Sequence, residues 1–375
     1  MKIGIVGGTF DPIHSGHIAL GNAALSKLKL DKVLFIPANV PYFKTSKRNV
    51  TMPIHRENMV RLATASNPRF EVCDIELKRE GNTYTVDTLY ELKKIYKDDE
   101  LYLIVGADTF PKINAWHRPR EIFKLCTVVV ADRKDQIKSK DLDREIKLAQ
   151  HFRSAKVIKL KLKGYKISST KIRKKVGSGK YKIDTPKSVI EYIKTTGLYL
   201  NKLKNKQIIA RLFVELSYKR FIHTIGVANT ALDLAAIFGY NSPKKAYKAA
   251  LLHDCAKPYA DALSHAGKGA KFASSYYGIK DEEILNAIRY HTIGRVDMSL
   301  LEKIIFVADF IEPSRKNFKR LDDIRKAAYE DIDKATYMCM ESTREYLRRT
   351  GKPIDDESNK VYTYYKNLIS EETHG

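Results

Sequence analysis

The stretch Ile3-Gly4-Ile5-Val6-Gly7-Gly8-Thr9-Phe10-Asp11-Pro12-Ile13-His14-Ser15-Gly16-His17 decides the fold of the first half of the chain. Its apolar start predicts a buried strand, and the paired glycines predict a tight turn where backbone and ligand approach closely. The helical pattern that follows indicates a helix beginning near the two histidines. Because a helix N-terminus presents unpaired N–H groups, we expect phosphate to bind there. The alternative is an ordinary strand–turn–helix connection with two incidental histidines.

The composition is typical of a soluble globular protein with more than one domain. The chain has 375 residues, of which 43% are hydrophobic and 30% are charged, and its length favours two domains. We expect neither a signal peptide nor a membrane span, because no uncharged apolar stretch is long enough. The cysteines form no C-x-x-C pair and are expected to be reduced thiols of a cytoplasmic protein: Cys73, Cys126, Cys255 and Cys339.

The net charge of +24 lies mostly in the first half of the chain. Between Arg153 and Lys182 there are twelve basic residues and no acidic one. Such a surplus is typical of nucleic-acid binding, but no RNA-binding motif or aromatic interleaving accompanies it here. We therefore favour a general lysine bias combined with anionic substrates, and we expect no nucleic-acid partner.

Apolar strands alternate with helical patterns through residues 1–200. We expect strands at 3–6, 32–37, 70–77, 101–105, 127–131 and 157–162, and helices that include 54–66, 85–96 and 186–195. This alternation predicts a Rossmann-like α/β fold, with a parallel sheet covered on both faces. Ligands bind at the carboxyl ends of strands in such sheets, which is where Gly106, Asp108 and the Asp132-Arg133 pair fall.

A second phosphate-binding helix start is predicted at Ile167-Ser168-Ser169-Thr170-Lys171-Ile172-Arg173. Ser168 or Ser169 would cap this helix, and its first turn carries cations. The nearby Gly177-Ser178-Gly179-Lys180 lacks the other features of a phosphate loop, and we interpret it as a turn. Residues 201–207 are polar and lysine-rich, and we expect them to form a linker.

In their order and content, these motifs resemble those of bacterial nicotinate-nucleotide adenylyltransferases over residues 1–200. The matching pieces are the opening stretch, Pro37-Ala38-Asn39 with Lys44, Tyr84 to Leu89, Gly106-Ala107-Asp108 with Trp116, Ile167 to Arg173, and Val189 to Tyr199. The family's loop commonly reads Pro-Pro-His-Lys, whereas this chain has Pro41-Tyr42-Phe43-Lys44. Any contact made by that histidine of the family is therefore absent.

The resemblance implies transfer of AMP from ATP to nicotinate mononucleotide, with release of pyrophosphate and with Mg²⁺ bridging the phosphates. It implies His14, His17, Lys44 and Arg173 as the groups that neutralise the triphosphate. Trp116, the only tryptophan, would stack on the pyridine ring, and the alternative is a structural core tryptophan. The implied nucleotide-binding residues are Gly7, Gly8, Thr9, Phe10, Thr85, Gly106, Asp108, Trp116, Arg133, Ser168 and Ser169.

From about Ile208 helical periodicity dominates, and no strand is predicted. Carboxylates in apolar runs, such as Asp254 and Asp309, have to be paired or metal-bound. Histidine and carboxylate ligands from several helices can build a metal site in a bundle core. Any one of the histidines is better explained as an ordinary core or surface residue, but the set favours a metal. The set, all within helical stretches, is His223, His253, Asp254, His265, His291 and Asp309.

This ligand set resembles the HD-domain phosphohydrolases of the YqeK type, and the likeness extends from about Lys206 to Leu368. The matching segments are Phe221 to Thr224, His253-Asp254 with Lys257, His265 to Gly267, Ile288 to Arg295 and Met298 to Arg315. The resemblance implies an all-α bundle over residues 208–375 that holds two metals, usually iron. It implies symmetrical cleavage of diadenosine tetraphosphate to ADP, with Lys257 and Arg295 neutralising phosphates. His265 follows His253 after a shorter segment than the family often has.

Two other interpretations of each half of the chain remain open. The second half could be a regulatory nucleotide-binding module or a different nucleotide phosphohydrolase, although an intact ligand set argues against a module without turnover. The first half could be another nucleotidyltransferase or, from its charge, an RNA-binding protein. Steep loss of binding with salt, without release of pyrophosphate from ATP, would support the RNA-binding alternative.

Overall fold

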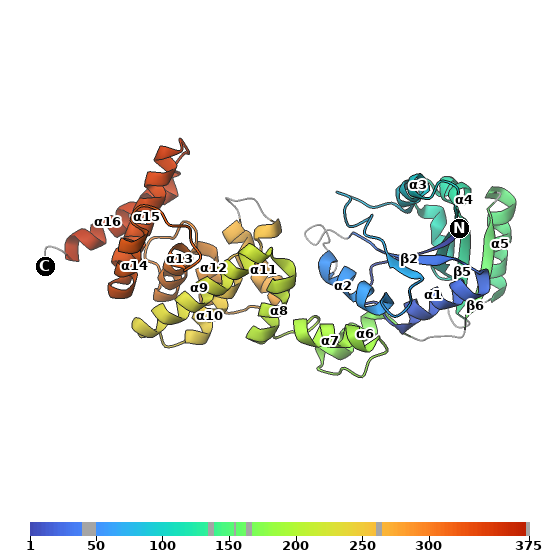
Figure 1. The fold of residues 1–375 in the computed structure, drawn as a ribbon, viewed down its shortest axis with the longest axis horizontal. Coiled ribbons are helices and arrows are strands. Elements are labelled where there is room, and N and C mark those ends of the chain that lie inside the picture. The colour runs from blue at the N-terminus through green and yellow to red at the C-terminus, as the bar shows by residue number, and fades with distance from the viewer. Residues whose placement is uncertain (40–49, 134–138, 154, 163–166, 260–264, 373–375) are drawn as a thin grey trace. The chain divides into compact units, whose positions relative to one another are not determined.

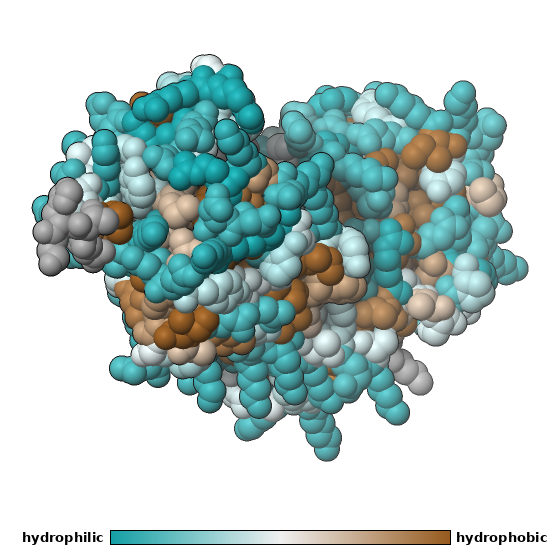
Figure 2. All heavy atoms as spheres, turned by 60° about the vertical axis from the view of Figure 1, so that its left-hand side comes forward, coloured by the Kyte–Doolittle hydropathy of each residue, from teal (hydrophilic) through white to brown (hydrophobic). Residues whose placement is uncertain are grey.

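The computed structural model describes residues 1–39, 50–133, 139–153, 155–162, 167–259 and 265–372 (Figure 1). The chain forms two compact units, Met1–Leu200 and Asn201–Gly375. Within the described ranges, no helix is both long enough and apolar enough to cross a membrane. On the face drawn in Figure 2, hydrophilic residues predominate and hydrophobic ones form separate patches, as expected for a chain with 30% charged residues.

The first unit is built on a six-stranded sheet in which all neighbouring strands are parallel. The strand order is β3-β2-β1-β4-β5-β6. From β1 the sheet grows in one direction through β2 and β3 and in the other through β4, β5 and β6, so the switch point lies between β1 and β4. The carboxyl ends of strands at such a switch point form a crevice. The strands are β1 (Lys2–Gly8), β2 (Lys32–Pro37), β3 (Phe70–Val72), β4 (Glu100–Gly106), β5 (Thr127–Arg133) and β6 (Val157–Leu162).

Helices cover both faces of this sheet, which is why its inner strands β1, β2, β4 and β5 are mainly apolar, whereas the edge strands β3 and β6 carry charged residues. Side chains alternate along β1, so that Ile3 and Ile5 join the core on one face while Val6 joins the core on the other. The predicted α/β fold with a parallel sheet is therefore confirmed. The helices are α1 (Ser15–Leu28), α2 (Pro53–Thr64), α3 (Thr85–Ile95), α4 (Pro119–Leu125), α5 (Ser139–Arg153), α6 (Ser169–Gly177) and α7 (Lys187–Thr196), with a 3-10 turn η2 (Phe110–Ala115).

Two local expectations were wrong in detail. The strand predicted at 70–77 ends at Val72, because the chain turns at Asp74, whose carbonyl accepts the N–H of Leu77 at 2.9 Å. The segment predicted as a linker at 201–207 is helical from Asn205, and Leu203 and Gln207 are buried. The first helix of the second unit therefore begins inside the polar segment.

The second unit is helical throughout its described residues, as predicted. Its central helix α13 (Leu300–Ile311) is almost entirely apolar and packs against α9, α10, α12 and α15. The other helices are α8 (Asn205–Glu215), α9 (Tyr218–Ile237), α10 (Pro243–Leu252), α11 (His265–Tyr277), α12 (Glu282–Tyr290), α14 (Leu321–Glu330), α15 (Ile332–Arg349) and α16 (Asp356–Glu372), with a 3-10 turn η3 (Lys257–Tyr259).

Candidate active sites

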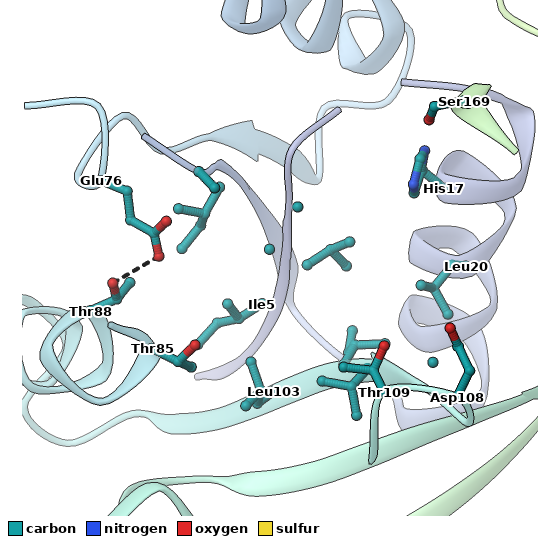
Figure 3. A pocket seen from close by; sticks show the side chains of 18 of the residues that line it. Ile5, His17, Leu20, Glu76, Thr85, Thr88, Leu103, Asp108, Thr109 and Ser169 are labelled. Atoms are coloured by element: carbon teal, nitrogen blue, oxygen red, sulfur yellow. Dashed lines mark hydrogen bonds between the residues drawn. The ribbon is translucent and has the colours of Figure 1, made fainter. Parts of the chain in front are cut away.

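A cavity of about 610 Å³ lies at the carboxyl ends of β1 and β4 in the first unit (Figure 3). Figure 3 shows Glu76, Thr85 and Thr88 on one side of it and His17, Leu20 and Asp108 on the other. Lining residues also come from the N-termini of α1, α3 and α6, whose N–H groups and dipoles favour anions. The cavity unites most of the predicted residues: Gly7, Gly8, His14, His17, Thr85, Gly106, Asp108, Trp116, Ser168 and Ser169.

The two histidines of the opening stretch form one rigid unit at the start of α1. His14 is the N-cap residue, and its backbone N–H donates to His17 Nδ1 at 3.2 Å. The two rings stack with their centroids 3.8 Å apart, and the ring of Phe10 meets His17 edge to face at 5.1 Å. Since His17 Nδ1 accepts a hydrogen bond, the neutral ring carries its proton on Nε2, where it can donate to a phosphate.

The β1–α1 loop brings ligand and backbone close together. No atom lies within 4 Å of the position that a Cβ at Gly7 would take, so the backbone there is open to the cavity. Phe10 is buried, with 2% of its surface exposed, and neither Phe10 nor Thr9 is a lining residue. These two predicted nucleotide-binding residues therefore shape the loop in this structure.

Arg173 belongs to α6 and contacts the β1–α1 loop, and it is not among the lining residues of the cavity. Its Nη1 donates to the carbonyl of Asp11, and its Nη2 donates to Thr170 Oγ1 at 3.1 Å. Asp11 is buried and accepts the hydroxyl hydrogen of Tyr199 at 2.9 Å. Lys44 lies outside the described residues, and Arg133 ends β5 with a side chain that is also outside them.

Five of the six predicted metal ligands meet in the second unit. We call these five residues the donor cluster. They come from α9, the end of α10, the end of α12 and α13, and they are His223, His253, Asp254, His291 and Asp309. The ligand atoms of His223, His253 and Asp254 lie within 4.8 Å of one another, as do those of His253, His291 and Asp309. His265 begins α11, and its side chain lies outside the described residues.

Two of the cluster histidines follow helices instead of lying within them, which differs from the sequence pattern. His253 is the C-cap residue of α10, and His291 is the C-cap residue of α12. The Nδ1 of each lies 2.7 Å from the carbonyl oxygen three residues earlier, at Ala250 and Ile288. The last carbonyls of a helix are poorly satisfied by backbone N–H groups, and that of Ala250 has only a long bond of 3.4 Å from the His253 backbone, so each ring N–H supplies a stronger donor. Nε2 is then the atom that remains for the cluster.

The interior of the donor cluster combines buried bases with ionised carboxylates. His253 is fully buried, and its Nε2 has no hydrogen-bond partner among the described residues. Burial lowers the pKa of His253 to about 4, so the ring is neutral. Burial opposes ionisation of Asp254 and Asp309, yet neighbouring histidines and cations hold the pKa of both carboxyls below the usual range. Neutral imidazoles and ionised carboxylates are the forms that bind divalent metals.

Basic side chains surround the two carboxylates. Arg220 Nη1 lies 2.7 Å and Lys257 Nζ 3.2 Å from Asp254 Oδ2. Arg315 Nη2 lies 2.9 Å from Asp309 Oδ1. These three cations are each about one third or more exposed, so they face outward from the cluster and are placed to meet an anionic ligand.

Comparison with known proteins assigns the two units. Residues 5–175 match the cytidylyltransferase-like family, and residues 220–314 match the HD domain family. A protein from Thermoanaerobacter sp. (strain X514), named probable nicotinate-nucleotide adenylyltransferase, is 42% identical over 207 residues, which are 55% of this chain and 97% of that protein. The chain belongs to the nicotinate-nucleotide adenylyltransferase family. In it, an HD domain follows the adenylyltransferase unit.

Further relatives match one or both units. A Mycoplasma genitalium protein named probable nicotinate-nucleotide adenylyltransferase/Ap4A hydrolase is 28% identical over 380 residues, covering 92% of this chain and 99% of its own. A crystal structure from Clostridium acetobutylicum, titled as a predicted HD superfamily hydrolase involved in NAD metabolism, is 35% identical and covers 44% of this chain and 99% of its own, with a TM-score of 0.42. The Mycoplasma genitalium match thus runs across both units of this chain.

Sequence reasoning missed two charged residues of the adenylyltransferase unit. Glu76 lines the cavity and accepts the hydroxyl hydrogen of Thr88 at 2.9 Å, and burial raises its pKa (Figure 3). Arg56 is fully buried and donates to the carbonyls of Thr9 at 2.9 Å and Ala38 at 2.8 Å. It thereby ties the β1–α1 loop to the end of β2. An arginine in an amphipathic helix pattern gives no sign of burial, so this bond had no sequence signal.

The structure shows partners of charged residues in the HD domain that the sequence did not indicate. Arg295, whose contact with phosphates stays a prediction, pairs with the buried Glu302 at 3.0 Å and lies over the ring of Tyr290. Arg220 and Arg315 contact the cluster carboxylates in addition to Lys257. Arg220 could have been found from its place three residues before His223, which puts the two side chains on one side of α9.

Proposed function

We propose that the adenylyltransferase unit transfers AMP from ATP to nicotinate mononucleotide, giving deamido-NAD and pyrophosphate. The observation that carries this proposal is the stacked pair His14–His17 at the N-terminus of α1, in one cavity with the N-terminus of α6. Relatives that match this unit over nearly their whole length are named for this activity. Pyrophosphate release from ATP that depends on nicotinate mononucleotide would test the proposal.

The reaction requires alignment and neutralisation of charge more than a protein nucleophile. The phosphate of nicotinate mononucleotide attacks the α-phosphate of ATP, and the bond to the pyrophosphate breaks. Negative charge grows on the leaving group, and His17 Nε2–H together with the N–H groups at the starts of α1 and α6 is suited to stabilise it. Mg²⁺ would be held mainly by phosphate oxygens.

The two serines at the start of α6 have different hydrogen bonds. Ser168 Oγ accepts the N–H of Lys171 at 3.3 Å as the helix cap, so its own O–H is left to donate to a phosphate. Ser169 Oγ donates to the carbonyl of Pro12 at 2.9 Å. We therefore propose Ser168 as the phosphate donor and Ser169 as the residue that fixes the β1–α1 loop against α6.

The pyridine ring is assigned to the side of the cavity that holds Trp116 and Thr85. Trp116 is partly buried and lines the cavity, so it offers an aromatic face that a fully buried core tryptophan would not. Thr85 is the first residue of α3, whose N-terminal N–H groups favour a carboxylate. This placement supports nicotinate mononucleotide in preference to its amide.

For the HD domain we propose metal-dependent hydrolysis of a dinucleoside polyphosphate, with diadenosine tetraphosphate as the first candidate. The donor cluster fits a transition metal, because it offers nitrogen and carboxylate ligands and contains a buried histidine nitrogen that has no hydrogen-bond partner in the described part of the chain. We propose two ions, with iron as the first choice. When bound, such a metal acts as a Lewis acid and lowers the pKa of a coordinated water to about 7.

Two groups of residues would have different roles at the proposed metal site. His223, His253, Asp254, His291 and Asp309 would hold it, while Arg220, Lys257 and Arg315 would bind and orient the phosphates of the substrate. Elemental analysis of the purified full chain, followed by a panel of nucleotide substrates, tests this proposal. Nucleotide binding without turnover would favour the regulatory alternative.

A further inference from the structure

Each of the three described histidines of the donor cluster has its Nδ1 engaged by a fixed oxygen. For His253 and His291 the oxygen belongs to a backbone carbonyl, 2.7 Å away in both cases. A carbonyl is available because both residues directly follow a helix, where the last carbonyls are poorly satisfied by backbone N–H groups. An acceptor at Nδ1 sets the tautomer and the orientation of the ring, and it leaves Nε2 as the ligand atom.

His223 cannot use a backbone carbonyl in this way. It lies in the first turns of α9, and the carbonyls around it accept the N–H groups of the helix itself. Its Nδ1 instead lies 3.0 Å from Glu312 Oε1, while its Nε2 lies 3.0 Å from Asp309 Oδ1 in the cluster. The acceptor at Nδ1 of His223 is therefore a side-chain carboxylate, whereas for the other two histidines it is a backbone carbonyl at the end of a helix.

Glu312 is itself held in place from several directions. It follows α13 as its C-cap residue, and only 1% of its surface is exposed. Its Oε1 accepts the hydroxyl hydrogen of Ser314, and its Oε2 accepts the backbone N–H of Ser314, both at 2.7 Å. In the described part of the chain, His223 is the only ion-pair partner of this carboxylate. Burying a carboxylate costs free energy unless a partner compensates its charge, and His223 is placed to do so.

Gly226 provides the room that this carboxylate occupies. It lies one turn after His223 in α9, and a Cβ at this position would be 2.5 Å from Glu312 Oε2. Real Cβ atoms essentially never approach an atom that closely, so any larger residue at position 226 would push the carboxylate away from His223.

We infer that Glu312 is the positioning residue of the metal centre, because it holds the Nδ1–H tautomer of His223 and directs Nε2 towards the metal. This inference rests on the metal site proposed above and deepens it. Glu312 acts through His223 and touches neither the metal nor the substrate. Gly226 and Ser314 are the two residues that keep its carboxylate at the required place.

The experiment measures binding of Co²⁺ to the metal-free full chain, by competition with a chromophoric chelator and by the visible absorption spectrum of the bound ion. We expect Glu312→Ala to weaken Co²⁺ binding by about 10- to 100-fold and to change the spectrum. Glu312→Gln should weaken binding less than Glu312→Ala does, because its amide oxygen still accepts from Nδ1–H, whereas its amide nitrogen can no longer accept the backbone N–H of Ser314. Gly226→Ala should weaken binding although the carboxylate is still present.

Glu283→Ala is the matched control for loss of a hydrogen-bonded carboxylate. Glu283 belongs to α12 and accepts from Tyr240 at 2.7 Å and from Lys245 at 2.9 Å, and among the described residues no hydrogen bond or ion pair joins its carboxylate to the donor cluster. We expect Glu283→Ala to bind Co²⁺ like the parent chain. Circular dichroism verifies that each variant is folded, and adenylyl transfer verifies that the first unit is intact. If Glu312→Ala unfolds the HD domain, Glu312→Gln and Gly226→Ala decide.

Three results would overturn the inference, and they can be told apart. Parental affinity and spectrum in Glu312→Ala would show that Glu312 does not position a ligand. A Glu312→Gln variant as weak as Glu312→Ala would show that the charge matters and the acceptor geometry does not. A parent chain that binds no Co²⁺ would overturn the proposed metal site itself, and this inference with it.

Discussion

His253 Nε2 lies 3.7 Å from Asp309 Oδ1, a separation that is too long for a hydrogen bond. Ligand atoms that share one tetrahedral metal ion, each about 2.0 to 2.2 Å from it, lie about 3 to 4 Å apart. The two atoms belong to the end of α10 and to α13, two elements that pack against each other. The spacing of this pair is therefore that of two ligands around one cation.

The adenylyltransferase site should depend strongly on His17. We expect His17→Ala to lower kcat for adenylyl transfer by at least about 100-fold with the fold intact, because a donor to the developing charge is lost. Steady-state assays of pyrophosphate release measure this effect. His151→Ala, an exposed histidine on α5, is the control and should keep parental activity. Near-parental activity of His17→Ala would mean that the stacked pair has another role.

Substrate choice tests the assignment of the pyridine subsite. We expect a higher kcat/KM for nicotinate mononucleotide than for nicotinamide mononucleotide, because the N-terminus of α3 beside Trp116 favours a carboxylate. Parallel steady-state measurements with the two substrates and saturating ATP give the ratio. Equal values would refute the preference.

The buried Arg56 should be essential for the stability of the adenylyltransferase unit. Arg56→Ala leaves the carbonyls of Thr9, Ala38 and Thr51 without their donor, and each such loss costs about 1 to 3 kcal/mol. We therefore expect a decrease of about 3 kcal/mol or more in the free energy of unfolding, measured by denaturant titration. Arg61→Ala in the same helix removes only an exposed pair with Glu57 and should change stability by less than about 0.5 kcal/mol. Similar losses in both variants would contradict this role.

Local motifs allowed the fold to be predicted, and the reason is physical. The opening stretch of β1 and the apolar runs of β2, β4 and β5 are buried on both faces, so their composition alone marks them as parallel strands. Ser168 was one of two candidate caps, and the structure assigns the cap to it. The strand at 70–77 was predicted too long because Cys73 and Ile75 pack on the core from a turn, which gives the same alternation as a strand.

The residues that could not be predicted are those whose role depends on a partner distant in the sequence. Arg56 and Glu312 each resemble surface charges in a linear pattern, and only the fold reveals what they bind. Arg295 is a related case, because nothing in the sequence indicated its pair with Glu302, while its contact with phosphate stays a prediction. Motifs identify the atoms that perform chemistry, whereas the supporting contacts come from tertiary structure.

Asp254→Ala separates the two active sites that we propose for the chain, one in each unit. Both activities of the full-length variant are measured in parallel, as release of pyrophosphate from ATP with nicotinate mononucleotide and as conversion of diadenosine tetraphosphate to ADP. Asp254→Asn, which keeps the size of the side chain, guards against simple misfolding. We predict that hydrolysis and bound metal fall by about 100-fold or more in both variants while adenylyl transfer is unchanged. Hydrolysis that survives either substitution, or joint loss of both activities, would contradict the account.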